Sequence, residues 1–325
     1  MRATRRSFAT AAALGAIWRP RPAAAAGWPS ERPIQVVVPF PPGGGVDQMA
    51  RLLLPHVERH LPGAQFVVEN RAGAGGQIGS EAAFTARPDG YALGAVTSPA
   101  LMTIAIERRV RYRVADFSYI ANVVDDPSGL WVAAKSPHRS LQDLLAAARK
   151  EPETVTLGTT GIGSDDHLLQ LNLEEAAPGV RFIHVPYAGT APMQTALLGG
   201  HLDVGSFNMG EGLAGLRDGR FRALAQSGAE RWAAARDVPT LREQGVDAQG
   251  GAQRGIVGPP GLPEPIRRRL VEAFGAALAD PGFRAEAERV DLPLRPMLGD
   301  EYRDAVLGTE GRLRELWKRR PWRDQ

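Results

Sequence analysis

The stretch that decides the fold is IQVVVPFPPGGGVDQMARLL, residues 34–53. It opens with an apolar run typical of a buried β-strand and passes through a loop of prolines and glycines. It continues with Val46, Met49, Leu53 and Val57 at helical spacing. A strand and a helix in this order form half of a βαβ unit. Because glycine leaves backbone N–H groups accessible at the start of a helix, the loop is also a natural place for an anion.

The same strand–loop–helix unit recurs along the chain in two sets. Further strand–loop pairs are expected at 66–76, 91–99, 155–164, 182–190 and 202–208. Strands that alternate with helices predict an α/β fold with mostly parallel sheets. A length of 325 residues also exceeds what one core usually supports. We therefore expect two lobes, each with its own mostly parallel sheet, joined by a two-strand hinge.

The boundaries between the lobes are expected where the pattern restarts. The first is near Asp125-Asp126-Pro127, and the chain is expected to return to the first lobe after the strand that ends at Ala225. The prediction is that residues 27–125 and 226–325 form lobe 1 and residues 126–225 form lobe 2. Ligands of open α/β sheets bind beyond the carboxyl ends of the strands, so the glycine-rich loops of both lobes should face one cleft.

Residues 1–26 read as an export signal and not as part of the fold. Thr4-Arg5-Arg6-Ser7-Phe8 resembles a twin-arginine signal, an apolar run follows over 9–18, and Ala23–Ala26 supplies small residues for cleavage after Ala26. The apolar run is too short for a membrane-spanning helix, which needs about 20 residues. These features predict a periplasmic protein.

Removal of the signal changes the charge of the chain. Residues 1–26 hold five arginines and no acid, so their loss takes the formal charge from +3 to −2. This charge argues against nucleic acid as a partner. The chain contains no cysteine, which excludes a disulfide framework, a cysteine nucleophile and thiolate metal sites.

None of the loops matches a motif for catalysis or for a cofactor. Gly43-Gly44-Gly45 lacks the Lys-Ser/Thr of a P-loop, the loop at Gly73 lacks the dinucleotide register, and no serine sits in a G-x-S-x-G elbow. His56 and His60 stand in His-Val-Glu-Arg-His, which is not the H-E-x-x-H zinc motif. We expect no enzyme activity, no cofactor and no metal.

Distinctive motifs occupy these loops from Trp28 to the C-terminus. They are PFPPGGGVD at 39–47, ENRAGAGG at 69–76, PDGY at 88–91, GIGS at 161–164, HL at 167–168, VPY at 185–187, GGHLD at 199–203 and DVPT at 237–240. As a set they resemble the Bug-type family, the substrate-binding proteins of tripartite tricarboxylate transporters. The resemblance implies a type II Venus-flytrap fold, no catalysis, and a small carboxylate, amide or aromatic acid as ligand.

Carried over by position, the resemblance implies ligand-binding residues in the loops of both lobes. They are Phe40, Pro42, Gly43, Asp47, Asn70, Ser98, Gly163, Ser164, His167, Tyr187, Gly189, Thr190 and Asn208. Structural roles stay open as alternatives: core packing for Phe40 and Tyr187, capping for Asp47 and Asn70, and support of the preceding loop for His167.

Two features depart from the family pattern. Asp165 and Asp166 follow Ser164, where they either cap a helix or, if they face the cleft, favour an amine or amide over an anion. Arg254 lies in a segment where relatives often carry a tryptophan. It is either a bidentate partner for a carboxylate or a surface arginine, and we include it among the candidates.

The leading hypothesis is a monomeric receptor that delivers a small organic acid to the membrane permease of a tripartite tricarboxylate transporter. A receptor that presents its ligand to a sensor is the first alternative, and an exported hydrolase on the same scaffold is the second. A neighbouring permease gene would separate the first two hypotheses, and turnover in a hydrolase screen would identify the third.

The twin-arginine motif predicts how the protein leaves the cytoplasm. Replacing Arg5 and Arg6 by lysine should retain the precursor inside the cell, because the export machinery reads the arginine pair. Cell fractionation and N-terminal sequencing measure this, and the mature chain should begin near Gly27. An intact Met1 on protein found outside the cytoplasm would disprove the prediction.

Overall fold

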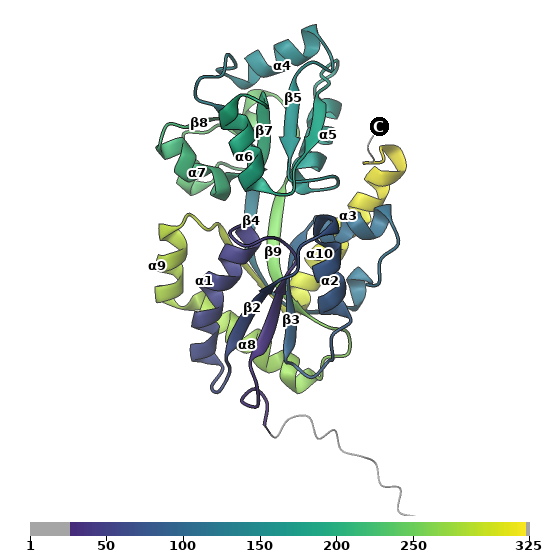
Figure 1. The fold of residues 1–325 in the computed structure, drawn as a ribbon, viewed down its shortest axis with the longest axis vertical. Coiled ribbons are helices and arrows are strands. Elements are labelled where there is room, and N and C mark those ends of the chain that lie inside the picture. Colours follow the sequence, from purple (N-terminus) through teal and green to yellow (C-terminus); the bar gives the residue numbers. More distant parts are fainter. Residues whose placement is uncertain (1–26, 323–325) are drawn as a thin grey trace, which may run out of the picture.

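The computed structural model describes residues 27–322, so the export signal predicted for residues 1–26 lies outside the described residues. Two lobes are stacked along the long axis of the molecule, and β4 (Ser118–Ala133) and β9 (Gly251–Gly258) lie between them (Figure 1). β4 is a single strand that belongs to the sheets of both lobes, with β9 beside it in lobe 1. The expected two-lobed α/β fold is confirmed.

Lobe 1 contains the N-terminal and C-terminal parts of the chain. Its sheet has the order β2-β1-β3-β9-β4, with β10 also paired to β4. Its other strands are β1 (Ile34–Val38), β2 (Phe66–Asn70), β3 (Ala92–Ser98) and β10 (Leu294–Leu298). Its helices are α1 (Gly45–His60), α2 (Gln77–Phe84), α3 (Ala100–Glu107), α8 (Glu264–Ala279), α9 (Pro281–Arg289) and α10 (Gly299–Arg319), with 3₁₀ turns at Ala74–Gly76 and Val114–Asp116.

Lobe 2 repeats the arrangement on a smaller sheet. β4 is followed in that sheet by β7, β5 and β6, and β8 pairs with β4 as well. The strands are β5 (Thr156–Thr159), β6 (Ile183–Pro186), β7 (Val204–Asn208) and β8 (Phe221–Gln226). The helices are α4 (Leu141–Lys150), α5 (Asp165–Ala176), α6 (Thr190–Gly199) and α7 (Met209–Arg217), with 3₁₀ turns at Ala233–Ala235 and Arg242–Gln244.

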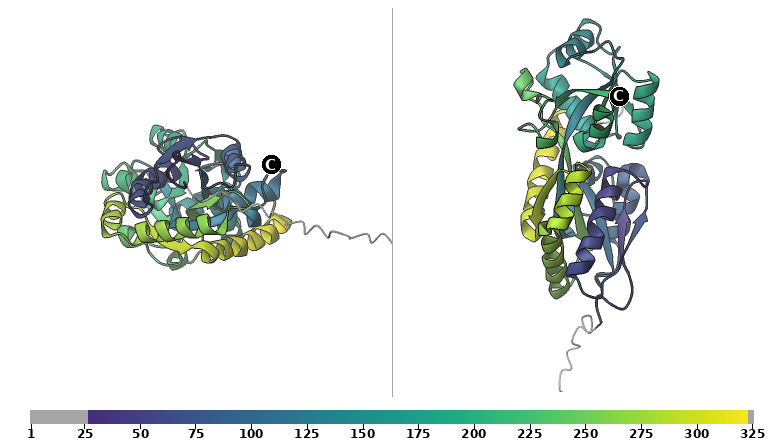
Figure 2. Two further views of the ribbon diagram at one scale, coloured as in Figure 1. Left: turned by 90° about the horizontal axis from the view of Figure 1, so that it is seen from below. Right: turned by 90° about the vertical axis from the view of Figure 1, so that its left-hand side faces the viewer.

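The outer strands of each lobe run parallel, as the repeated unit predicts. β1 is parallel to β2 and β3, and β5 is parallel to β6 and β7. The strands at the hinge add antiparallel pairs, because β4 and β9 cross between the lobes in opposite directions. Figure 2 shows the helices on both faces of these sheets. The loops after β1, β3, β5, β6 and β7 therefore lie at the sheet edges that face the other lobe.

The lobe boundary predicted after Ala225 is misplaced by about one loop. β8 pairs with β4 inside the sheet of lobe 2, where Ala133 lies opposite Phe221. Beyond β8, Leu241, Val246 and Ala248 are buried in the core of lobe 2. The chain returns to lobe 1 only where β9 begins, because the irregular segment before it carries apolar side chains that complete the second core. This segment has no strand–helix repeat that would reveal its lobe.

Local sequence signals account for several element boundaries. The predicted capping box is present at the start of α4, where Ser140 accepts from the Asp143 N–H and Asp143 accepts in return from the Ser140 N–H. In the core of lobe 2, Trp131 stacks on Phe207 with ring centroids 5.0 Å apart. Within residues 27–322 no helix is both long and apolar enough to cross a membrane.

Candidate functional site

The loop between β1 and α1 is held in shape by two of the predicted residues. Asp47 is buried and accepts from the Gly43 N–H at 2.9 Å, and Asn70 donates to the Phe40 carbonyl and to Asp47. Burial opposes ionisation of Asp47, but hydrogen bonds from Arg51, Gly43 and Asn70 outweigh it and hold the pKa of this carboxyl below its usual value. Asp47 and Asn70 therefore support the loop, and Pro42 and Gly43 form its exposed tip.

The corresponding loop of lobe 2 is supported from inside the lobe. Ser164 caps α5 by accepting from the His167 N–H, and His167 Nδ1 accepts from the Gly163 N–H at 3.0 Å. The His167 ring stacks on His184 at 3.9 Å between centroids. Burial, followed by the nearby charges of His184 and Arg320, lowers the pKa of His167 to about 3, so this ring stays neutral at physiological pH. His167 matches the predicted alternative of a loop support.

A third part of the site lies at the starts of α6 and α7. Tyr187 and Gly189 precede α6 and are partly exposed, and Thr190 donates to Glu211 Oε2 at 2.8 Å. Glu211 lies in the first turn of α7, directly after Asn208 at the end of β7. This contact joins the N-termini of two neighbouring helices of lobe 2.

Arg254 occupies the centre of the site and is 4% exposed, so the surface reading of this residue is wrong. From β9 its guanidinium donates to Asp126 at 3.0 Å and to Asn208 at 2.8 Å, and it lies 3.6 Å from Glu211. A Cβ on Gly45 would stand 2.6 Å from the Arg254 Cζ, so the guanidinium lies directly against the first turn of α1. Arg254 thus contacts α1 of lobe 1 and α7 of lobe 2 at the same time.

The acids around Arg254 outnumber it, and burial raises the pKa values of three of them, Asp126, Asp165 and Asp166. Burial raises the pKa of Asp126 to about 7 even though Arg254 counteracts it. Burial raises the pKa of Asp165 as well, and burial together with the charge of Asp165 raises the pKa of Asp166 well above its usual value. Asp165 accepts from Ser128 and Asn208, and Asp166 accepts from Thr160. Both acids are therefore hydrogen-bonded within the protein.

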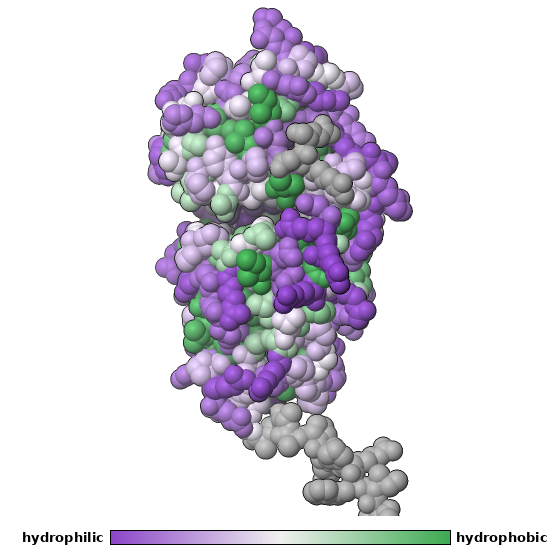
Figure 3. All heavy atoms as spheres, turned by 45° about the vertical axis from the view of Figure 1, so that its right-hand side comes forward, coloured by the Kyte–Doolittle hydropathy of each residue, from purple (hydrophilic) through white to green (hydrophobic). Residues whose placement is uncertain are grey.

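Three helix N-termini meet at this place. Among the residues that the structure describes, no side chain caps α1 or α6, so their first N–H groups keep a partial positive charge. In the first turn of α7 the Gly210 N–H donates to Asp126 Oδ1 at 3.0 Å. A Cβ added at Gly43 or Gly189 would meet no described atom within 4 Å, which leaves the backbone there open. Figure 3 shows the surface hollowed between the two lobes. The arrangement can hold an anion without a buried lysine or arginine reserved for it.

A second inter-lobe space lies on the other face of the hinge strands. It has a volume of about 1190 Å³ and is lined by Gln253, Asp125 and Ser98 among others. Neighbouring residues of a strand point to opposite faces, so Gln253 and Arg254 face different sides. Ser98 pairs with Gln253 and lines this groove, which also reaches Asp165.

Apart from Ser98, the structure sorts the predicted residues into two groups. Phe40, Pro42, Gly43, Tyr187, Gly189 and Thr190 are exposed or half-buried in loops at the facing edges of the two lobes. The others are buried or hydrogen-bonded behind these loops: Asp47, Asn70, Gly163, Ser164, His167, Asn208 and Arg254. Two residues of the site were missed, Asp126 and Glu211. The signal for Glu211 was present, because it follows the strand end at Asn208.

The two histidines of α1 each lie next to a carboxylate of α9 or of the residue before it, and they are not arranged as ligands of one metal ion. His56 Nε2 lies 3.1 Å from Glu286, and His60 Nε2 lies 3.6 Å from Asp280. Within residues 27–322 no group of three or more histidine and acidic side chains could hold a metal ion.

Comparisons of the sequence and of the structure with known proteins point to the same family. Residues 49–303 match the family model TctC, described as the tripartite tricarboxylate transporter family receptor. A UPF0065 protein of Cupriavidus necator is 32% identical, covering 90% of this chain and 89% of its own. The structure of the periplasmic binding protein BugD superposes with a TM-score of 0.81 at 29% identity, over 91% of this chain and 99% of BugD.

A further solved structure holds a ligand. MatC from Rhodopseudomonas palustris with bound malate superposes with a TM-score of 0.79 at 27% identity, over 88% of this chain and 99% of MatC. These neighbours are substrate-binding proteins and not enzymes.

The buried ion pair at the hinge predicts a large loss of stability in Arg254→Ala. Removal of the guanidinium takes the donor away from Asp126 Oδ2 and Asn208 Oδ1 and leaves the buried Asp126 carboxylate without its counter-charge, and breaking such a pair costs about 3–5 kcal/mol. Urea unfolding measures the change, with Arg268→Ala as a control because its 69% exposed side chain forms only a loose pair with Glu272. Equal stability of the two variants would contradict the assignment.

The raised pKa of Asp166 predicts a pH-dependent gain from Asp166→Asn. The native state keeps a proton that the unfolded state releases above its pKa of about 3.8, so wild-type stability falls as pH rises through the interval between the two pKa values. Asparagine removes this loss. The stability of the variant relative to wild type should therefore increase as the pH rises above about 3.8, where unfolded wild type releases the proton that the native state keeps. Thermal unfolding across pH measures it, and a pH-independent difference would refute it.

Proposed function

The chain belongs to the tripartite tricarboxylate transporter receptor family, and from this premise we propose that it captures a small organic carboxylate between its two lobes. The captured molecule is handed to a membrane permease of the tripartite type. The place of capture is the periplasm, which agrees with the signal predicted in residues 1–26. The chain acts as a receptor and changes no bond of its ligand.

The observation that carries the proposal is the meeting of three helix N-termini between the lobes, of which those of α1 and α6 have no side-chain cap among the described residues. Helix α1 comes from lobe 1, and α6 and α7 come from lobe 2. A carboxylate placed there accepts from backbone N–H groups, and the partial charges of the helices favour its negative charge. MatC, which has the same fold, holds malate, a carboxylate.

The acids beside the site do not argue against an anion. Asp165 and Asp166 are buried, their pKa values are raised, and their oxygens accept from Ser128, Asn208 and Thr160. A raised pKa means that burial opposes the negative charge of both carboxyls, and their oxygens are already engaged by donors of the protein. Glu211 remains, and it is paired with Thr190 and lies near Arg254. The capping and bracing role of Asp165 and Asp166 is therefore favoured over recognition of an amine.

A ligand screen tests the proposal directly. Thermal shift followed by calorimetry, with mono- and dicarboxylates, amides and amines as separate groups, should identify carboxylates as the stabilising class. A ligand that binds only the native state raises the midpoint temperature of unfolding. At a concentration a hundred times its Kd, it adds about 2.7 kcal/mol to the free energy of unfolding. A response to amines alone would overturn the carboxylate assignment.

The two ends of α6 offer a matched pair of variants for the binding site. Gly189 precedes the helix and Gly200 follows it, both have positive φ, and a Cβ at either position would meet no described atom within 4 Å. Valine therefore introduces backbone strain at both positions, in the left-handed helical region at Gly200 and in an extended region with positive φ at Gly189. Gly189→Val should weaken binding of a carboxylate found in the screen by about tenfold or more, equivalent to 1.4 kcal/mol, because it covers the helix N-terminus. Gly200→Val should bind like wild type.

Calorimetry of both variants decides whether the loops form the site. Equal affinity in Gly189→Val and Gly200→Val would place the ligand elsewhere. Equal loss in both variants would attribute the effect to general strain and would likewise contradict the proposal.

A further inference from the structure

The C-terminal end of α10 leaves the lobe in which the helix begins. Tyr302 and Val306, near the start of α10, are buried in a cluster with Tyr119 of β4 in lobe 1. The same cluster contains Leu168 and Leu171 from α5 of lobe 2. Figure 1 shows the yellow end of α10 reaching the level of the upper lobe, near α5. The last helix therefore forms a second connection between the lobes, in addition to the hinge strands.

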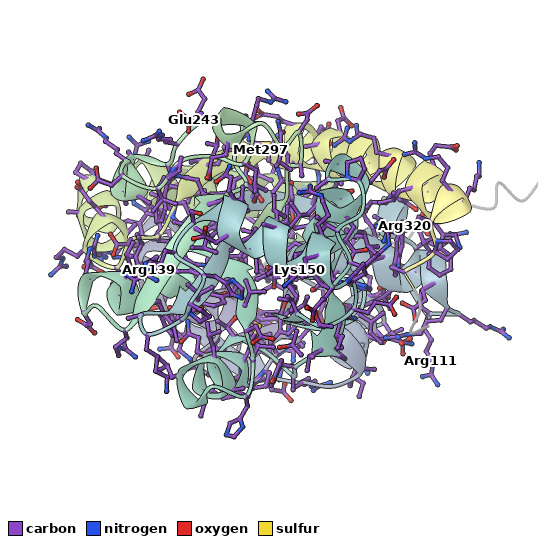
Figure 4. The ribbon with its side chains drawn as sticks, turned by 90° about the horizontal axis from the view of Figure 1, so that it is seen from above. Arg111, Arg139, Lys150, Glu243, Met297 and Arg320 are labelled. Carbon is purple, nitrogen blue, oxygen red and sulfur yellow. The ribbon has the colours of Figure 1, made fainter. Side chains whose placement is uncertain are left out.

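Arg320 forms the polar part of this connection. It follows α10 directly, as Figure 4 shows, and its Nη1 donates to the Leu171 carbonyl of α5 at 2.8 Å. The other guanidinium nitrogen pairs with Glu174, whose side chain is only 4% exposed. A hydrogen bond from a charged donor to a buried carboxylate is among the stronger contacts in a protein.

Trp322 forms the apolar part and reaches the glycine loop of lobe 2. Its ring is fully buried and lies 4.6 Å from the Trp317 ring between centroids. A Cβ added at Gly163 would stand 3.2 Å from Trp322 Cδ1 and 3.1 Å from Thr103 Oγ1, so both side chains contact this loop. Thr103 of α3 in lobe 1 also donates to the Gly163 carbonyl at 2.6 Å. The loop is thus held from lobe 1 at a point next to its helix α5.

We propose that residues 320–322 are a strap that ties lobe 2 to lobe 1 beside the cleft and positions the loop 161–164. Trp322 is a positioning residue, because it acts on the ligand-facing loop through packing against Gly163. The strap limits how far the lobes separate around β4 and β9. This inference does not depend on which ligand the protein binds.

The contact between residues 320–322 and lobe 2 is one that can be released. Trp322 Nε1 and Gln170 Oε1, which are both buried in this region, have no hydrogen-bond partner within residues 27–322. Buried polar atoms without partners oppose the packed state, and both would be hydrated after release. The strap is therefore held by ring packing and by Arg320, and the indole N–H contributes nothing to it.

The test uses the whole mature protein without ligand, so its outcome is independent of the proposed function. The chain has no cysteine, which allows spin labels at Gln48→Cys on α1 and Thr195→Cys on α6, both exposed and one in each lobe. The distance distribution between the labels reports lobe separation. Hydrogen exchange of the loop 161–164 reports its positioning, and the Gly163 N–H is protected by His167.

Arg320→Ala and Trp322→Ala should broaden the label distance distribution and speed exchange in the loop about tenfold or more. Trp322→Phe should stay close to wild type, because it keeps a ring and loses only the unpaired N–H. Val306→Ala is the control, since it removes apolar volume from the same cluster about 20 Å before the end of the helix. It should lower stability and leave both readouts unchanged.

Three results would overturn the strap. The first is an unchanged distance distribution and loop exchange in both alanine variants. The second is a change in Val306→Ala as large as in Trp322→Ala, which would make the effect one of general core stability. The third is an equal loss in Trp322→Phe and Trp322→Ala. Arg320→Ala keeps the test informative if Trp322→Ala does not fold, because the Arg320 side chain is 30% exposed.

Discussion

The contact on which the site depends is that between the buried guanidinium of Arg254 and the groups that surround it. Asp126 comes from β4, Asn208 and Glu211 come from the start of α7, and Gly45 begins α1. Burial works against the Arg254 charge, but Asp126 and Glu211 outweigh burial and hold its pKa above the usual value. One permanent positive charge therefore lies where hinge and helices from both lobes meet. The glycine at position 45 is required for this approach, since a side chain there would collide with the guanidinium.

The fold was predictable from the sequence to a large extent, because its signals are local. The apolar run at 34–38 and the loop of glycines after it define one unit, and the same unit recurs in both halves. The capping box at Ser140 and Asp143 gave a helix start that the structure confirms. The return to lobe 1 was not predictable in this way. Residues 227–250 contain no repeat, and their lobe is decided by where Leu241 and Val246 find a core to enter.

The candidate site was predictable at the level of loops but not of side chains. Position along the chain brings a residue to the sheet edge, yet the direction of its side chain depends on partners far away in sequence. The Asp47 side chain points inward because its carboxylate accepts hydrogen bonds from Asn70 and from the Gly43 N–H. Arg254 reads as a surface residue until Asp126, which lies 128 positions earlier in the chain, is placed beside it. The sequence left Asp165 and Asp166 as helix caps or cleft residues for the same reason, because Ser128 and Asn208, which donate to Asp165, lie far away along the chain.

The continuity of β4 has a mechanical consequence. This strand has 16 residues and takes part in both sheets without a loop between them. Relative rotation of the lobes must then be absorbed as torsion of β4 and the ribbon that it forms with β9, and torsion displaces the midpoint of a strand least. Asp126 lies near the midpoint of β4, where it pairs with Arg254, so the buried charge pair lies at the place that lobe rotation would displace least. Substitutions near Asp126 and Arg254 would alter the stiffness of the ribbon between the lobes. Substitutions at the loop tips would alter which ligand the protein binds.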